Sequence, residues 1–154
     1  MAAIGKVSLR GLVHDEFQYT FLVASGTGEA TISDAGVKAM SQDTNASNTV
    51  KLALDGEEII GRLEIYEDRV LEGIVVGTIS LKGGLKFMVS PHAIGTSPAE
   101  VPTLSDYLVG AVDNDGIGGY VRKATSSEIS AGKCKYKVFE VAEDDSYVIA
   151  VAVK

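Results

Sequence analysis

A segment of alternating apolar and polar residues, divided by glycines, is the feature that most limits what this chain can form. It covers residues 55–87 and reads DGEEIIGRLEIYEDRVLEGIVVGTISLKGGLKF. A period of two places alternate side chains on opposite faces of an extended strand, and glycine permits the positive φ angles of tight turns. Residues 55–72 carry seven carboxylates and two arginines but no histidine, cysteine or serine. The segment therefore predicts acidic, turn-rich β-sheet and no reactive centre.

Length and composition set the outer limits. The chain has 154 residues, enough for one domain with a sizeable core, and its 17 glycines against 3 prolines favour turns over helices. It has one cysteine, no signal-peptide pattern and no run of about 18 apolar residues, so we expect a cytoplasmic origin and no membrane partner. A net charge of −7 argues against nucleic acid as a partner, because phosphate binding relies on lysine and arginine.

Strands are predicted along most of the chain. Residues 16–23 alternate strictly, and residues 49–54 and 58–67 flank an Asp-Gly dipeptide, so we expect these two runs to pair as an antiparallel hairpin. The glycine pair at 83–84 either closes a hairpin within residues 75–89 or bends one long strand. Short strands are expected at 107–112 and 120–124. A last hairpin is expected to join residues 134–141 to a central strand at 147–153, which is apolar on both faces.

Helix is expected to be minor. Residues 34–40 are the one predicted helical turn, capped by Ser33 or Asp34, with Gly36 inside it. The predicted class is all-β, a small barrel or sandwich built from antiparallel hairpins. We expect residues 16–154 to form a single β domain, and residues 1–15 to be an N-terminal arm or the first strand.

One stretch begins like a calcium-binding loop. Residues 113–116 read DNDG, but the fifth position is Ile117 and the twelfth is Ala124, where oxygen ligands are needed. Aspartate, asparagine and glycine are common in turns for conformational reasons, so a plain turn is expected.

Other reactive residue types lack the neighbours that catalysis needs. The two histidines, His14 and His92, are not placed by the sequence near Cys134 or a suitable serine. Cys134 shares a strand face with Tyr136 and Val138, which favours a buried and inert thiol. No glycine-rich phosphate-binding motif is present in the sequence. The sequence therefore predicts no catalytic, cofactor-binding or metal site.

Two oppositely charged segments are the strongest sign of a partner. Residues 55–72 carry two arginines and seven carboxylates, a net charge of −5, and residues 122–137 carry five cations and one carboxylate, a net charge of +4. They favour head-to-tail contact between copies or docking on a charged scaffold, or else form solvated surface of little energetic effect. The candidate partner contacts are Arg10, Glu57, Glu58, Glu64, Glu67, Arg122, Lys123, Lys133, Lys135 and Lys137.

A family resemblance suggests which partner this is. The pattern DGxxIIGRL, then EDRVxEGIVVGTISLKGGLKF, a short VGAV strand and a final hairpin resembles small capsid decoration, or cement, proteins of tailed bacteriophages. The likeness covers residues 30–154 and rests on structural glycines and alternation. It implies a small β-barrel or β-tulip-like structural protein of the virion, a homotrimer bound to the major capsid protein on the outside of the head. It also implies an arm at residues 1–14, which would add a strand to a neighbour's sheet or to its own barrel.

Two alternatives belong to other functional classes. The stretch VDNDGIGGYV resembles the uracil-binding hairpin of trimeric all-β dUTPases, but the chain has no GRSS-like phosphate motif and no glycine-rich, arginine-bearing C-terminal arm. A carbohydrate-binding or host-attachment module on the virion would need an aromatic platform. The chain has no tryptophan, six tyrosines and four phenylalanines, so such a platform is hard to assemble.

The missing phosphate motif leads to a first prediction. Purified protein should not hydrolyse dUTP or other nucleotides, because nothing in the sequence is arranged to hold their phosphates. Release of pyrophosphate or phosphate can be followed at increasing protein concentration. Turnover that scales with protein and survives repurification would favour the dUTPase alternative.

Overall fold

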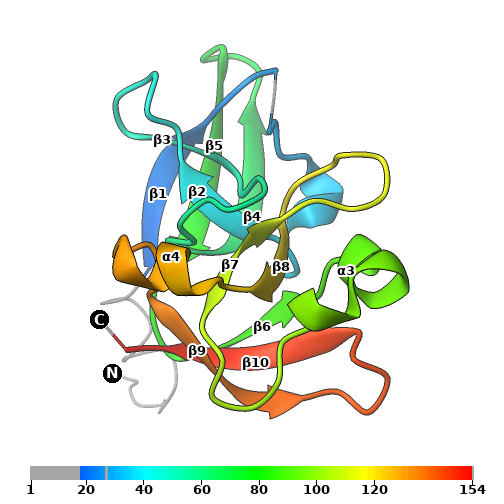
Figure 1. Cartoon of the computed structure of the whole chain (residues 1–154). Helices are drawn as coiled ribbons and strands as arrows, with labels where there is room; N and C mark the ends of the chain where they lie inside the picture. Colours follow the sequence, from blue (N-terminus) through cyan, green and yellow to red (C-terminus); the bar gives the residue numbers. More distant parts are fainter. Residues whose placement is uncertain (1–17, 27, 154) are drawn as a thin grey trace, which may run out of the picture.

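The protein is a closed five-stranded β-barrel with a second, smaller layer packed against one side of it (Figure 1). A computed structural model describes residues 18–26 and 28–153. Strands make up 42% of the structure and helices 13%, which confirms the predicted all-β class with a small barrel. The expected N-terminal arm, including Arg10 and His14, lies outside the described residues.

The barrel is made by the first five strands. They are β1 (Gln18–Val23), β2 (Ala39–Gln42), β3 (Thr49–Leu52), β4 (Gly61–Arg69) and β5 (Ile74–Ser80). Their order around the barrel is β1-β3-β2-β4-β5, and β1 runs parallel to β3 while the other described neighbours pair antiparallel. Alternation places Met40, Val50, Leu52, Leu63 and Ile79 in one buried cluster, which is the core of the barrel.

The second layer contains two small sheets. Strands β6 (Gly84–Met88), β9 (Tyr136–Val141) and β10 (Tyr147–Ala152) form one sheet in the order β6-β10-β9, and β7 (Leu108–Ala111) pairs with β8 (Tyr120–Lys123). The helical segments are η2 (Ile32–Asp34), α3 (Pro91–Thr96), η3 (Pro98–Glu100) and α4 (Ser126–Ser130). The predicted final hairpin, the central position of its second strand and the pair of short strands are confirmed.

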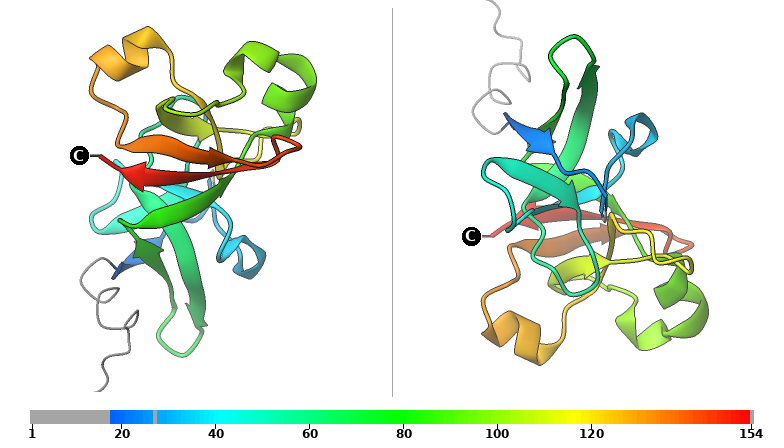
Figure 2. Two further views of the ribbon diagram at one scale, coloured as in Figure 1. Left: turned by 90° about the horizontal axis from the view of Figure 1, so that it is seen from below. Right: turned by 90° about the horizontal axis from the view of Figure 1, so that it is seen from above.

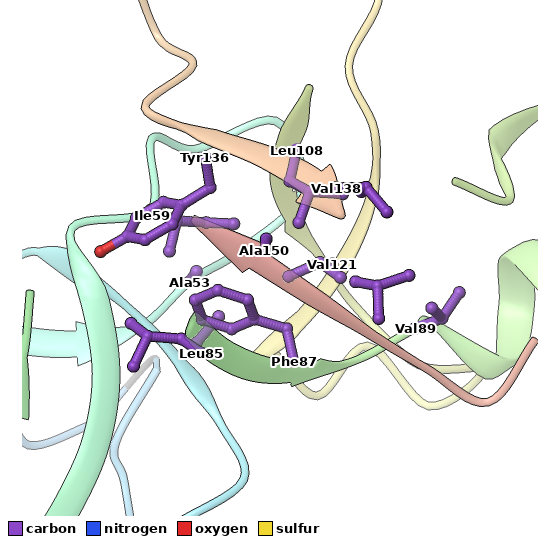
Figure 3. Close-up of a cluster of buried hydrophobic side chains, with 12 residues drawn as sticks. Ala53, Ile59, Leu85, Phe87, Val89, Leu108, Val121, Tyr136, Val138 and Ala150 are labelled. Atoms are coloured by element: carbon purple, nitrogen blue, oxygen red, sulfur yellow. The ribbon is translucent and has the colours of Figure 1, made fainter. Parts of the chain in front are cut away.

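A second hydrophobic core fills the space between the two layers (Figure 3). Phe87 and Tyr136 meet edge to face there, with ring centroids 5.2 Å apart. The Tyr136 hydroxyl donates to the carbonyl oxygens of Ile60 and Leu81, which belong to the ends of barrel segments. One side chain therefore supplies both apolar contact and hydrogen bonds across the boundary between the layers. Its burial raises the pKa of the Tyr136 phenol.

The predicted hairpin between residues 49–54 and 58–67 is wrong. Strand β3 pairs with β1 and β2, and β2 lies between β3 and β4 in the barrel. The Asp-Gly turn does form, with Gly56 at a φ of 76°, but it does not return the chain along β3. Residues 53–60, which we name the crossing segment, instead leave the barrel and run against the second layer.

Backbone hydrogen bonds hold the crossing segment in that place. The Gly56 N–H donates to the Gly110 carbonyl at 3.0 Å, and the Gly110 N–H donates to the Glu57 carbonyl at 2.8 Å. The Gly119 N–H donates to the Ala53 carbonyl, also at 2.8 Å. Partners more than fifty residues away thus satisfy backbone groups that a local hairpin would otherwise have paired. A dipeptide turn signal contains no information about such partners.

The predicted helical turn at residues 34–40 is also wrong. Only the single 3₁₀ turn η2 forms, and its cap is Thr31 with Asp34 reaching back to the Thr31 N–H at 2.8 Å. Gly36 has a φ of 82°, which ends any helix there. Ala39 is fully buried in β2 and pairs with β4, so barrel closure overrides the weak local preference.

The structure answers the question left open at residues 83–84 and shows which faces of β10 are buried. At residues 83–84 the chain passes from the barrel to the second layer, and β5 and β6 pair with different strands, so no hairpin forms. In β10, Val148 and Ala150 face the core, while Ile149 and Val151 lie on the opposite face and are partly exposed. Cys134 is buried, as predicted, and it packs in a small cluster with Val109 and Ala124, whereas Tyr136 and Val138 belong to the core between the layers.

The close approach of β7 to the crossing segment can be tested with Gly110→Ala. A Cβ at Gly110 would lie 2.4 Å from the Leu54 carbonyl oxygen and 2.8 Å from the Ala53 Cβ. Both atoms are fixed by packed backbone, so we expect a loss of roughly 1–3 kcal/mol in the free energy of unfolding. Urea denaturation measures it.

Gly95→Ala is the matched control for this variant. A Cβ there meets nothing within 4 Å and lies in α3, so stability should stay the same or rise by about 0.5–1 kcal/mol. Equal stability of the two variants would contradict the tight contact at Gly110.

Candidate partner-binding surface

The acidic and basic segments of the sequence meet each other within one chain. Arg122 Nε lies 2.8 Å from Asp55 Oδ1 in the crossing segment, and its Nη2 lies 2.8 Å from Glu128 Oε1. Lys135 Nζ lies 2.9 Å from Glu58 Oε2. Arg122 is only 7% exposed, so it is not the surface charge that the sequence suggested. Much of the predicted complementarity is therefore satisfied inside the molecule.

Glu128 is the main ion-pair partner of Arg122. It lies in the first turn of α4, where it also accepts from the N–H of Thr125 at 2.8 Å in a capping box. Burial alone would raise the pKa of Glu128, but hydrogen bonds from Arg122 and Thr125 outweigh burial and lower this pKa to about 2. Burial alone would lower the pKa of Arg122, and its hydrogen bonds with Glu128 and Asp55 raise it instead.

A polar groove lies beside Glu57 and Glu58, the other two carboxylates of the crossing segment. Glu57 pairs with Lys51 at 2.7 Å and also accepts from the Leu54 N–H, while Glu58 pairs with Lys135. The groove has a volume of about 440 Å³ and is lined by Ser41, Gln42, Thr44, Glu57, Glu58, Ile60, Lys133 and Lys135. Its charges pair across the groove, so it does not present one sign of charge to a partner.

The remaining lysines of the basic segment do not form one patch. Lys133 is exposed, with its Nζ 3.5 Å from the Gly56 carbonyl oxygen. Lys123 pairs with Asp106 at 3.3 Å. Lys137 lies on β9, with its Nζ 5.7 Å from the ring centroid of Tyr107. Each is held by a different neighbour.

The other two candidate acidic residues lie on a hairpin that projects from the barrel. Strands β4 and β5 extend past the rest of the barrel, as Figures 1 and 2 show. Glu64 forms an ion pair with Arg62 near its base, and Glu67 pairs with Arg69 at 2.7 Å toward its end. These four charges are exposed or partly exposed.

Sequence reasoning missed the apolar residues at the end of this hairpin. Val70 is 76% exposed and Leu71 is 102% exposed, within a turn that we name the hairpin tip (residues 68–73). The sequence did contain a signal, because an apolar pair between Asp68-Arg69 and Glu72-Gly73 interrupts a charged turn without continuing the strand alternation. At the end of a turn, such a pair has no position that faces a hydrophobic core.

A second apolar surface is the outer face of the sheet β6-β10-β9. We name it the outer sheet face; register and alternation place on it Lys86, Met88, Lys137, Phe139, Glu140, Tyr147, Ile149 and Val151. Register places Ile149 opposite Lys86 and Val151 opposite Lys137. In the left view of Figure 2 no other described element covers β10 and its neighbours. Phe139 is 64% exposed there.

Chemically reactive groups are not assembled in the part of the chain that the structure describes. No group of three or more histidine, cysteine, aspartate or glutamate side chains suited to a metal ion occurs among residues 18–26 and 28–153. His92 contacts Asn114 through its Nδ1 at 3.3 Å. Asp113 Oδ1 accepts from the N–H groups of Asp115 and Ile117, so its carboxylate closes its own turn.

Comparison with known proteins adds no relative. No protein-family model, no curated protein and no solved structure matches this chain. Within the described residues, none of the helices has the length and apolar character to cross a membrane.

The ion pair between buried Arg122 and partly buried Glu128 predicts how stability depends on pH. Glu128→Gln removes the charge that faces Arg122, and we expect a loss of roughly 1–3 kcal/mol in the free energy of unfolding at pH 7. The folded-state pKa of about 2 lies below the ordinary value of 4.5, so the stabilisation is complete above pH 4.5 and is lost as pH falls toward 2. The stability difference between wild type and variant should therefore shrink over this range.

Urea denaturation at a series of pH values measures this difference. Glu140→Gln, an exposed carboxylate on β9, is the control and should change stability little at any pH. A Glu128→Gln difference that stays constant from pH 6 to pH 3 would contradict the lowered pKa.

Proposed function

We propose that this protein is a non-enzymatic structural protein that attaches to the outer surface of a tailed-phage head, binds the major capsid protein and stabilises the shell. The sequence resemblance over residues 30–154 supports this proposal, and the small barrel fits what the resemblance implies. The same resemblance supports a homotrimer on the virion, made in the host cytoplasm.

The observation that carries the proposal is the outer sheet face. It presents an aromatic ring, Phe139, beside the partly exposed column of Tyr147, Ile149 and Val151. An exposed and contiguous apolar surface with polar edges is typical of protein-binding sites. An open sheet face also suits the broad surface of a shell better than a small ligand, which needs a concave site.

Neither alternative gains support from a particular contact. For a dUTPase, the stretch that resembles a uracil-binding hairpin forms the connection between β7 and β8, and Asp113 is engaged by its own turn. For a carbohydrate-binding module, an aromatic platform is needed. Phe139 shares its sheet face with one other aromatic residue, Tyr147, and otherwise with aliphatic and charged side chains, a mixture that suits a protein surface better.

Phe139→Asp tests the proposal. Both the wild-type chain and the variant are incubated with phage heads that lack this protein, and bound protein is measured after the heads are sedimented. We expect occupancy at subsaturating concentration to fall roughly tenfold, because an exposed aromatic residue at the centre of an interface often dominates affinity. The melting temperature should barely change, since the side chain is mostly exposed.

Leu104→Asp is the matched control. Leu104 is also 64% exposed, but it lies in the loop before β7, so occupancy should match that of wild type.

Lys137→Glu should weaken binding at low salt and have less effect at high salt, because the Debye length falls from about 10 Å at 0.1 M to about 3 Å at 1 M. Equal occupancy of wild type and Phe139→Asp would rule out the outer sheet face as the docking surface.

A further inference from the structure

The hairpin tip leaves its apolar side chains in water on an isolated copy of the chain. Val70 and Leu71 are the most exposed of the large hydrophobic residues described, and the carboxylates of Glu67, Asp68 and Glu72 surround them. Residues 64–72 carry four carboxylates and one arginine, a net charge of −3. The tip is therefore an apolar knob with an acidic rim.

The tip cannot bury these side chains against its own molecule. β2 pairs with β4 only at Gly61 and Arg62, and the described β-pairing of residues 65–69 is with β5 alone. Both views of Figure 2 show the hairpin pointing away from the second layer. Within residues 18–26 and 28–153 no element therefore pairs with the end of the hairpin beyond β4 and β5 themselves.

A pocket of opposite character opens between the barrel and the sheet β6-β10-β9. It has a volume of about 270 Å³, the space of roughly nine water molecules at about 30 Å³ each, which is enough for a leucine side chain. Its described lining consists of Phe21, Ile60, Leu81, Lys82, Lys135, Tyr136 and Ala152. Most of these side chains are apolar, and the two charged ones are both lysines.

We propose that the hairpin tip of one copy inserts into this pocket on a second copy, with Leu71 in the apolar interior and Asp68 and Glu72 near Lys82 and Lys135. One chain carries both halves of the contact. Both are apolar at their centres, the acidic rim of the tip is opposite in charge to the lysines of the pocket, and the pocket is large enough for the Leu71 side chain. The contact joins two different surfaces, so it is heterologous and closes into a ring when the rotation between copies allows it. Lys135 already pairs with Glu58, and an acidic tip adds a second carboxylate partner for that lysine.

This self-association is separate from attachment to a head. The tip and pocket do not include Phe139 or the outer sheet face, and purified protein without heads is sufficient to measure it. A negative result in the head-binding experiment would not contradict self-association through the tip and pocket. A negative result for self-association would likewise not contradict binding to the head.

Leu71→Asp is the first test, by sedimentation equilibrium of the full chain over a wide concentration range. Wild type should form a discrete oligomer, and the variant should dissociate at roughly tenfold or more higher concentration, because a charged group replaces the apolar knob. Leu104→Asp serves as the control, since it is exposed but lies outside tip and pocket. Both variants should keep the wild-type melting temperature of the monomer.

A mixing experiment separates a heterologous contact from other kinds. Lys82→Glu should weaken self-association by changing the pocket and leaving the tip intact. A mixture of Leu71→Asp and Lys82→Glu chains still contains one intact pocket and one intact tip. It should form one-to-one complexes that grow no further, with an affinity near that of a wild-type contact.

Three outcomes would overturn the proposal. A wild-type chain that stays monomeric throughout would mean that no second copy fills the pocket. A Leu71→Asp variant that associates like wild type would exclude the tip. Two weakened variants that fail to form mixed complexes would mean that tip and pocket do not bind each other.

Discussion

The position of the crossing segment determines how the rest of the molecule is arranged. Residues 53–60 connect β3 to β4 of the barrel, and the second layer packs on them. Ile59 enters the core between the layers, and the carbonyl of Ile60 accepts from Tyr136. Gly110 and Gly118 allow this approach, because a Cβ at either position would collide with a carbonyl of the segment.

The crossing segment also determines which charged residues form ion pairs. Asp55 and Glu58 extend from it to Arg122 and Lys135 of the basic segment, and Glu57 pairs with Lys51, so all three carboxylates of the crossing segment are paired within the chain. Breaking the Arg122 cluster would leave a charge in a poorly hydrated place, which makes the cluster a strong constraint on geometry even where its net contribution to stability is small. The surface left for partners is therefore more apolar than the sequence suggests.

The outer sheet face and the hairpin tip lie at opposite ends of the molecule. The outer sheet face lies on the second layer, and the hairpin tip projects from the far end of the barrel (Figure 1). A copy attached to a shell through its sheet would keep its tip available to reach a neighbouring copy. Contacts between neighbours would then add to each attachment by raising the effective concentration of adjacent copies.

Local signals were enough to predict the class of the fold. Alternation and turn residues placed β1, β7, β8, β9 and β10 close to their observed bounds, because strand periodicity and turn conformations depend on near neighbours. The buried thiol of Cys134 was predictable for the same reason.

Only the tertiary structure decided which strands pair and which charges meet. The Asp-Gly turn is compatible with a hairpin, but barrel closure places β2 between β3 and β4, and that choice depends on contacts far apart in the chain. Arg122 and Asp55 are separated by 67 residues, so no sequence spacing could show that they form an ion pair. The exposure of Leu71 likewise follows from how far the hairpin extends beyond the barrel, which is a property of the folded molecule and not of the turn itself.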